Sequence, residues 1–282
     1  MKAALFDYAH PQDVAHALDL LGTHTGIAKL MGGSQSLGPM LNLRLARPKF
    51  VVDVSGIPGL RTVTEKAGWI RIGSAVTHAE IEDGVHALLR NGPLQTVAAG
   101  IAYRAVRNRG TIGGSLAHAD PAADWLVVAV GFGASIEITS AAGVRTLAAD
   151  AFMLGAYTTV LAEDDIISAV LFPAASASMR WGYSKLCRKT GEFAEASCAA
   201  YFDAARGVAR IAIGALSGAP KVLADFAATV AAQGAPAVTQ STITAAIAQA
   251  MHDHDVVDRQ LHVVAVERCL QQIFGAPDTT WR

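Results

Sequence analysis

The 282-residue sequence predicts an α+β protein in two parts. Short apolar strands alternate with helical segments as far as residue 172, and a small polar stretch over 174–179 follows them. Beyond that stretch, three strand-like runs come first and three alanine-rich helices come after them. Strands followed by helices are typical of an α+β arrangement, so we expect a domain boundary near residue 174. The expected domains are 1–173, with subdomains of about 1–55 and 56–173, and 178–280.

Residues 1–55 predict a small α/β unit. Pro11 suits the first position of a helix that Gly22 can end. The apolar runs 27–31 and 50–54 predict strands, and a loop and a short helix lie between them. The first of these strands runs directly into the loop, so the loop begins where a strand ends.

The rest of the chain predicts shorter elements. Thr77 and Glu80 have the spacing of a capping box, which opens a short helix. Up to residue 172 we further expect a strand over 69–73, a helix over 93–101, a basic loop over 103–109, a helix from Pro121 to 130, a hairpin of 134–139 and 144–147, and a strand over 166–172. The second part predicts a three-strand meander over 183–188, 197–202 and 209–216, then helices over about 220–232, 240–252 and 256–274.

The composition narrows the class of protein. Hydrophobic residues make up 52%, and 23 basic residues nearly balance 24 acidic ones, which predicts a globular protein without a basic field for nucleic acid or anionic lipid. No apolar stretch reaches the roughly 18 residues of a membrane-spanning helix, and the N-terminus turns polar at Asp7. We therefore expect a cytoplasmic protein.

The cysteines and histidines give little support to a metal site. Cys187, Cys198 and Cys269 are scattered and form no CxxC pair, so we expect free thiols and no iron–sulfur cluster or zinc held by this chain. His252 and His254 lie in a polar segment between two expected helices, where a solvated or capping role is favoured over a metal site.

Two diglycine loops are the strongest functional feature. They are Gly32 to Ser36, which follows a strand, and Gly110 to Ser115. Glycines permit positive φ and close approach of a ligand to backbone N–H groups, so two such loops can grip a pyrophosphate. The alternative is two tight turns of an α/β fold. Neither loop reads GxGxxG or GxxxxGK[ST], so a Rossmann site is not supported and a P-loop is excluded.

Three longer stretches, taken together, carry a resemblance. They are KLMGGSQSLGPMLNLRLARPKFVVDVS over 29–55, VRNRGTIGGSLAHADPAADW over 106–125 and KLCRKTGEFAEAS over 185–197. They resemble the FAD-binding medium subunits of molybdenum hydroxylases of the xanthine dehydrogenase and carbon monoxide dehydrogenase type. The resemblance runs over nearly the whole chain. It implies a two-subdomain FAD-binding fold of the vanillyl-alcohol oxidase/p-cresol methylhydroxylase type, with a C-terminal domain packed near the isoalloxazine.

The resemblance also implies the cofactor contacts, which we expect to be non-covalent. The pyrophosphate would be held by Leu30, Met31, Gly32, Gly33, Ser34, Gln35, Ser36 and Leu37 from the first loop, and by Thr111, Gly114 and Ser115 from the second. Many relatives have His in place of Gln35 and Asn in place of Ser115. Asp124 would accept hydrogen bonds on the adenosine side, and Ile101 and Ile167 would pack on the cofactor. Lys185 would lie near the flavin ring, and Phe193 against its face.

Several of these residues have a structural alternative. Asp124 suits a cap of the helix opened at Pro121, Lys185 a solvated strand position, and Phe193 an ordinary core position. Arg104, Arg107 and Arg109 form a basic loop that suits a solvated face, an acidic partner or the cofactor phosphates.

The resemblance implies the function of an electron-transfer subunit. Relatives work with a large molybdenum-cofactor subunit and a small subunit that carries two [2Fe-2S] clusters, and their flavin reduces NAD, a quinone, a cytochrome or oxygen. The substrate pocket lies outside this chain, which we expect to contribute no residue to the hydroxylation chemistry. The alternatives are a stand-alone flavin oxidoreductase of the same fold and a flavoprotein without catalytic activity.

Overall fold

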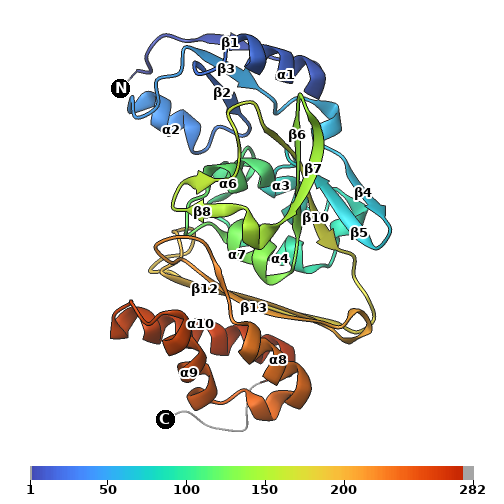
Figure 1. Cartoon of the computed structure of the whole chain (residues 1–282), viewed down its shortest axis with the longest axis vertical. Helices are drawn as coiled ribbons and strands as arrows, with labels where there is room; N and C mark the ends of the chain where they lie inside the picture. The colour runs from blue at the N-terminus through green and yellow to red at the C-terminus, as the bar shows by residue number, and fades with distance from the viewer. Residues whose placement is uncertain (1, 276–282) are drawn as a thin grey trace. The chain divides into compact units, whose positions relative to one another are not determined.

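The computed structural model describes residues 2–275 and divides them into two compact units (Figure 1). The first unit consists of the chain up to residue 119 together with 135–147 and 158–172. The second unit consists of 120–134, 148–157 and the chain from residue 173. The expected domains, 1–173 and 178–280, are continuous segments of chain and stay a prediction; residues 276–280 lie outside the described residues.

The first unit opens with a three-stranded parallel sheet in the order β1-β3-β2. Its strands are β1 (Asp7–Ala9), β2 (Ala28–Met31) and β3 (Phe50–Asp53), and its helices are α1 (Val14–Thr23) and α2 (Leu37–Asn42). Figure 1 shows these elements in blue. The first diglycine loop therefore lies between the carboxyl end of β2 and the start of α2. In open parallel sheets this is the edge where ligands bind.

Helix α1 begins three residues later than the sequence predicts. Asp13 is its N-cap, and the Asp13 carboxylate accepts a hydrogen bond of 2.8 Å from the backbone N–H of His16. A capping carboxylate satisfies an N–H group of the first turn, which Pro11 cannot do. The buried Ala17 and Leu21 then face the core, where they join Val52 of β3.

The second part of this unit is built around a five-stranded sheet in the order β4-β5-β10-β6-β7. Its strands are β4 (Val63–Lys66), β5 (Trp69–Gly73), β6 (Ser135–Ser140), β7 (Gly143–Ala148) and β10 (Ile166–Pro173). Its helices are α3 (His78–Glu82), α4 (Pro93–Ala99), α5 (Arg104–Arg107) and α6 (Ile112–His118). The capping box of Thr77 and Glu80 is confirmed, and the predicted basic loop contains the single turn α5.

The second unit contains an antiparallel sheet in the order β11-β12-β13-β14. Its strands are β11 (Met179–Leu186), β12 (Ala196–Asp203), β13 (Val208–Gly214) and β14 (Lys221–Val222), and its helices are α7 (Asp124–Gly131), α8 (Ala224–Gln233), α9 (Gln240–Ala250) and α10 (Val256–Phe274). The meander and the three C-terminal helices are confirmed, and β14 is an addition. Within this unit, α8 to α10 lie on one side of the sheet in Figure 1.

Helix α7 begins at Asp124 rather than at Pro121. Asp120 first accepts a hydrogen bond of 3.0 Å from the N–H of Ala122, which holds the chain in a turn before the helix. Every residue of α7 is buried. Besides these elements the chain has short strands and 3₁₀ turns: β8 (Met153–Gly155), β9 (Thr158–Thr159), η1 (Pro58–Leu60), η2 (Ala87–Leu89), η3 (Ala149–Ala151), η4 (Ala204–Arg206) and η5 (Ala235–Ala237).

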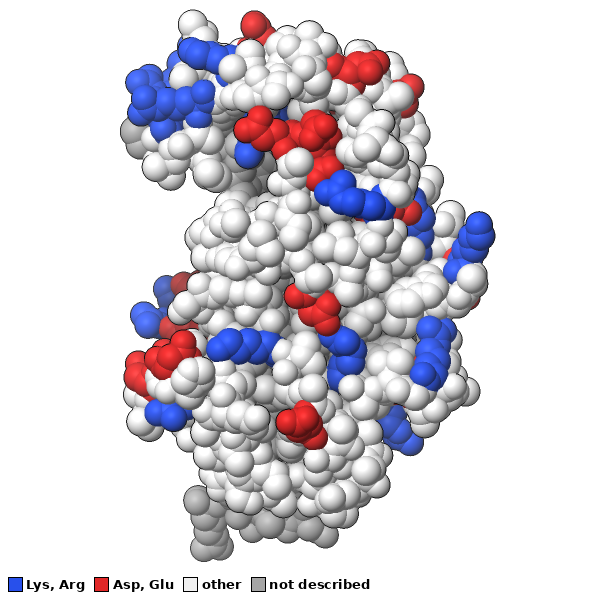
Figure 2. Space-filling model, in the orientation of Figure 1, with Lys and Arg blue, Asp and Glu red and all other residues white. Residues whose placement is uncertain are grey.

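The surface of the described residues agrees with the balanced charge of the sequence. On the face in Figure 2, basic and acidic side chains are interspersed over a mostly uncharged surface. Within residues 2–275, no helix has the length and apolar character that a membrane span requires. The same residues contain no group of three or more His, Cys, Asp or Glu side chains placed to hold a metal ion.

Candidate functional site

The two diglycine loops lie side by side in the first unit, although about 80 residues separate them in sequence. A β-carbon built on Gly33 would lie 1.8 Å from the carbonyl oxygen of Arg109, and one built on Gly32 would lie 3.0 Å from Thr111 Oγ1. The backbone of the second loop therefore packs directly on the backbone of the first. Only glycine allows that approach at position 33.

The role expected for the glycines has to be corrected in one respect. None of Gly32, Gly33, Gly113 and Gly114 has a positive φ, and the left-handed residue of the first loop is Ser34, with φ of 61°. The glycines act instead by leaving room for neighbouring backbone. Gly113 shows the same effect, since its β-carbon would lie 2.4 Å from the β-carbon of Ser74.

The first loop carries a row of free hydrogen-bond donors. Among the described residues, no acceptor faces the backbone N–H groups of the four residues from Gly33 to Ser36. The Gln35 side-chain amide donates to the Gly33 carbonyl at 3.0 Å, which fixes the turn of the loop. Successive N–H groups without an internal partner form a concavity that suits an anion such as a phosphate. These unpaired N–H groups favour the ligand-binding interpretation of the first loop over the tight-turn alternative.

The second loop uses its backbone donors within the fold. The N–H groups of Ile112, Gly113 and Gly114 donate to Val76 O, Ser74 O and Thr111 Oγ1, at 3.1, 2.9 and 3.0 Å. Thr111 is the buried N-cap of α6, and Gly114 is exposed on the first turn of that helix. What this loop offers a ligand is the bare surface at Gly114 and the hydroxyl of the partly exposed Ser115. The sequence suggests two similar turns, but the loops differ: the first has unpaired backbone N–H groups, and the second has its N–H groups paired within the protein.

The flanking site residues are placed as follows. Leu30 and Met31 form the end of β2, and Leu37 opens α2. Ile101 follows α4 and Ile167 lies in β10; both are buried, at 9% and 6% exposed. Their apolar side chains are compatible with packing on a cofactor, and this role stays a prediction.

A hollow of about 410 Å³ adjoins both loops. It takes in Gly33 of the first loop and Thr111 at the start of the second, and charged side chains of both signs reach it. The remaining lining residues are Ser55, Arg61, Thr77, Ala79, Glu80, Asp83, Asn108 and Arg109. Arg61 is paired with Glu80 at 2.6 Å, whereas Arg109 is exposed and has no carboxylate partner among the described residues.

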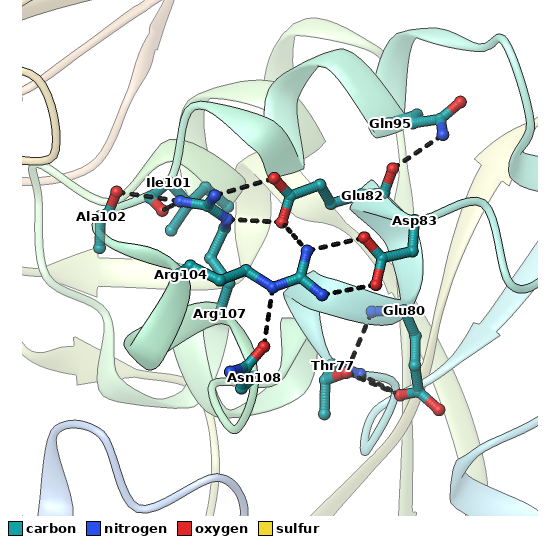
Figure 3. Close-up of polar contacts among 10 residues, drawn as sticks. All are labelled: Thr77, Glu80, Glu82, Asp83, Gln95, Ile101, Ala102, Arg104, Arg107 and Asn108. Atoms are coloured by element: carbon teal, nitrogen blue, oxygen red, sulfur yellow. Dashed lines mark hydrogen bonds and ion pairs between the residues drawn. The ribbon is translucent and has the colours of Figure 1, made fainter.

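The other two arginines of the basic loop are paired inside the chain (Figure 3). Arg104 bonds Asp83 at 2.6 Å and Glu82 at 2.8 Å, and Arg107 bonds Glu82 at 2.7 Å. Arg107 also donates to the carbonyls of Ile101 and Ala102, at 2.9 and 3.1 Å. Hydrogen bonds from Arg107 hold the pKa of Glu82 below its usual value, and those from Arg104 do the same for Asp83. These arginines therefore anchor α5 to α3, a role that the spacing of Glu82 and Asp83 did not reveal.

A second polar cluster lies within the second unit. Lys185 Nζ of β11 bonds Asp124 Oδ1 of α7 at 2.8 Å, and the Tyr183 hydroxyl donates to the same oxygen. The side chains of Lys185 and Asp124 are only 12% and 10% exposed. This burial makes the solvated alternative for Lys185 wrong. The capping alternative for Asp124 is wrong as well, because Ala123 is the N-cap of α7 and no side chain caps this helix. Tyr183 is the member that we did not predict, although residues two apart on a strand share one face.

Phe193 lies between β11 and β12 and is 66% exposed. The core alternative for this residue is wrong, because two thirds of the side chain is in solvent. A large exposed aromatic is available for a ligand or a partner. Its contact with the flavin stays a prediction.

Residues 4–175 match the family model described as the FAD binding domain in molybdopterin dehydrogenase. The chain belongs to this family. Its cofactor is therefore FAD, and the free donors of the first loop fit the diphosphate of that cofactor. The chain is accordingly an FAD-binding subunit of an oxidoreductase, and its resemblance to molybdenum hydroxylase subunits is confirmed.

Curated relatives and solved structures agree with this assignment. The nicotine 6-hydroxylase medium subunit of Paenarthrobacter nicotinovorans is 38% identical over 222 residues, which are 77% of each chain. The carbon monoxide dehydrogenase medium chain of Hydrogenophaga pseudoflava is 38% identical over 194 residues, 69% of this chain and 68% of that one.

Two carbon monoxide dehydrogenase structures superpose on almost the whole chain. The one from Hydrogenophaga pseudoflava covers 97% of this chain and 100% of its own, with a TM-score of 0.86 and 31% identity. The one from Oligotropha carboxidovorans covers 98% and 100%, with a TM-score of 0.88 and 26% identity. The α+β FAD-binding fold expected from the sequence is confirmed.

Proposed function

We propose that this chain is the medium subunit of a molybdenum hydroxylase complex. In that complex a large subunit holds the molybdenum cofactor and a small subunit holds [2Fe-2S] clusters. Electrons pass from the clusters to the FAD of this chain and then to an external acceptor, which is NAD, a quinone, a cytochrome or oxygen. The relatives named as medium subunits of nicotine 6-hydroxylase and carbon monoxide dehydrogenase support this assignment.

One observation carries the cofactor part of the proposal. The free N–H groups of the four residues from Gly33 to Ser36 can donate hydrogen bonds to the oxygens of a diphosphate. Thr111 caps α6 and so fixes the second loop against the first, and Ser115 adds a hydroxyl. When bound, FAD supplies the redox chemistry of the subunit, and the protein supplies binding, orientation and charge.

The remaining site residues have roles that follow from their chemistry. Ile101 and Ile167 offer apolar surface to the cofactor, and Phe193 offers an exposed ring. Asp124 is an acceptor whose charge Lys185 balances at 2.8 Å. A lysine ammonium near a flavin stabilises negative charge on the reduced ring, so we propose that Lys185 raises the reduction potential of the flavin.

The proposal is tested by assembling the complex. The chain is co-expressed with candidate molybdenum-cofactor and iron–sulfur subunits from the same genome, and the complex is purified. We expect FAD, molybdenum and iron to co-purify, and substrate to bleach the flavin absorbance only when all three subunits are present. Steady turnover of a purine or an aldehyde by the isolated flavin chain would instead favour the stand-alone oxidoreductase.

A further inference from the structure

Tyr183 and Lys185 lie on one face of strand β11, and Gly182 lies on the other. The carbonyl oxygen of Cys269, in α10, lies 2.2 Å from where a β-carbon of Gly182 would be, so Gly182 faces α10. Because side chains alternate along a strand, Tyr183 and Lys185 point to the opposite face. There they both bond Oδ1 of Asp124, the first residue of α7.

The carboxylate of Asp124 is held on one side only. Two donors share Oδ1, and Oδ2 has no hydrogen-bond partner among the described residues. The N-terminal turn of α7 favours a negative charge at this position. The arrangement leaves one carboxylate oxygen for a ligand while the other is fixed by protein.

Tyr183 is itself fixed at both its backbone and its hydroxyl. The Gln272 side chain of α10 accepts from the Tyr183 N–H at 3.0 Å and donates to the Tyr183 carbonyl at 2.8 Å. These two bonds pair the outward-facing backbone N–H and carbonyl of Tyr183, because β11 is an edge strand of its sheet and has no neighbouring strand on that side. Burial and the Asp124 carboxylate raise the pKa of Tyr183 well above 10, so the hydroxyl stays protonated and donates at neutral pH.

We propose that Tyr183 is a positioning residue for the flavin site. Its hydroxyl fixes the Asp124 carboxylate and, through it, the Lys185 ammonium in the arrangement that is presented to FAD. The effect on FAD rests on the proposed function, whereas the effect on Lys185 belongs to the chain itself. The two parts are therefore tested separately.

The first test needs no FAD. Lys185 acylation by acetic anhydride is followed by mass spectrometry in the wild-type chain and in Tyr183→Phe, which keeps the ring and removes only the hydroxyl. We expect acylation of Lys185 to become faster, because the Asp124 carboxylate that pairs with Lys185 loses the second donor that holds it in place. The matched control is Tyr201→Phe on β12, whose hydroxyl bonds Asp203 at 3.3 Å. Equal Lys185 acylation rates in all three proteins, each folded by circular dichroism, would overturn the proposal.

The second test asks whether the effect reaches the flavin. The flavin reduction potential is measured in wild type, Tyr183→Phe, Lys185→Met and the double variant. We expect Tyr183→Phe to lower the potential in the wild-type background and to have no effect in the Lys185→Met background. Equal shifts in both backgrounds would mean that Tyr183 does not act through Lys185. A wild-type chain that binds no FAD would defeat the proposed function and leave the acylation result standing.

Discussion

Replacing Gly33 by alanine would force the two diglycine loops apart. The new β-carbon would lie 1.8 Å from the carbonyl oxygen of Arg109, 2.4 Å from its carbonyl carbon and 2.8 Å from the α-carbon of Gly110. Ordinary contacts of a β-carbon begin at 3.4 Å, so the facing backbone has to retreat by about 1.6 Å.

That retreat is opposed by the bonds that hold the second loop. Gly110 donates to Val106 O at 2.7 Å and accepts from the N–H of His78 at 2.9 Å. Overpacking costs about 1–3 kcal/mol, and each backbone hydrogen bond lost adds about 0.5–1.5 kcal/mol. We therefore expect Gly33→Ala to lower the free energy of unfolding by about 2–4 kcal/mol and to weaken FAD binding more than tenfold.

The assay is urea unfolding followed by circular dichroism, combined with an FAD titration of the folded protein. Gly22→Ala is the matched control, because this glycine lies in α1, has an ordinary φ and has no atom within 4 Å of the new β-carbon. It should be neutral or stabilising by up to about 1 kcal/mol. If Gly33→Ala retained wild-type stability and FAD affinity, the close packing of the loops would not exist in solution.

Burial and the nearby charge of Arg107 lower the pKa of His78 to about 4. Between pH 6.5 and 4 the unfolded protein therefore binds more protons at this histidine than the folded protein does. Acidification over that range should remove up to about 3 kcal/mol of stability in urea melts, and His78→Gln should abolish that part of the loss. Gly114→Val should lower the free energy of unfolding by only about 1 kcal/mol, because the new β-carbon meets only the capping Thr111 Oγ1, at 2.9 Å. The same variant should weaken FAD binding more than tenfold, as measured by equilibrium dialysis. Arg107→Gln should lower the urea midpoint more than Arg104→Gln, because Arg107 is 11% exposed and Arg104 is 48% exposed; equal midpoints would contradict that ranking.

The sequence correctly predicted the elements whose structure depends on residues close together in the chain. The capping box at Thr77 and the meander of β11 to β13 follow from short-range spacing, and so does the loop that ends β2. Starting positions were less well predicted. Asp13, rather than Pro11, fixes the start of α1, because a side-chain hydrogen bond outweighs a favourable φ.

Tertiary contacts explain what the sequence did not predict. Gly33 is required by the backbone of Arg109, and Arg107 is paired with Glu82, which lies 25 positions earlier. Tyr183 joins the cluster because its strand packs near α7, and its spacing alone does not show that. The glycine pattern identified the two loops and the resemblance assigned them to FAD. Only the fold shows that the first loop has free N–H donors, whereas the second uses its donors within the protein.

The most direct test of the central claim is an FAD titration of the cofactor-free chain, followed by acid precipitation of the saturated protein. We expect one FAD per chain, bound at micromolar concentration or below and released into the supernatant by acid. A folded chain that takes up no FAD at micromolar concentration would contradict the claim that the first loop holds this cofactor. Yellow colour that stays in the precipitate would contradict the non-covalent attachment.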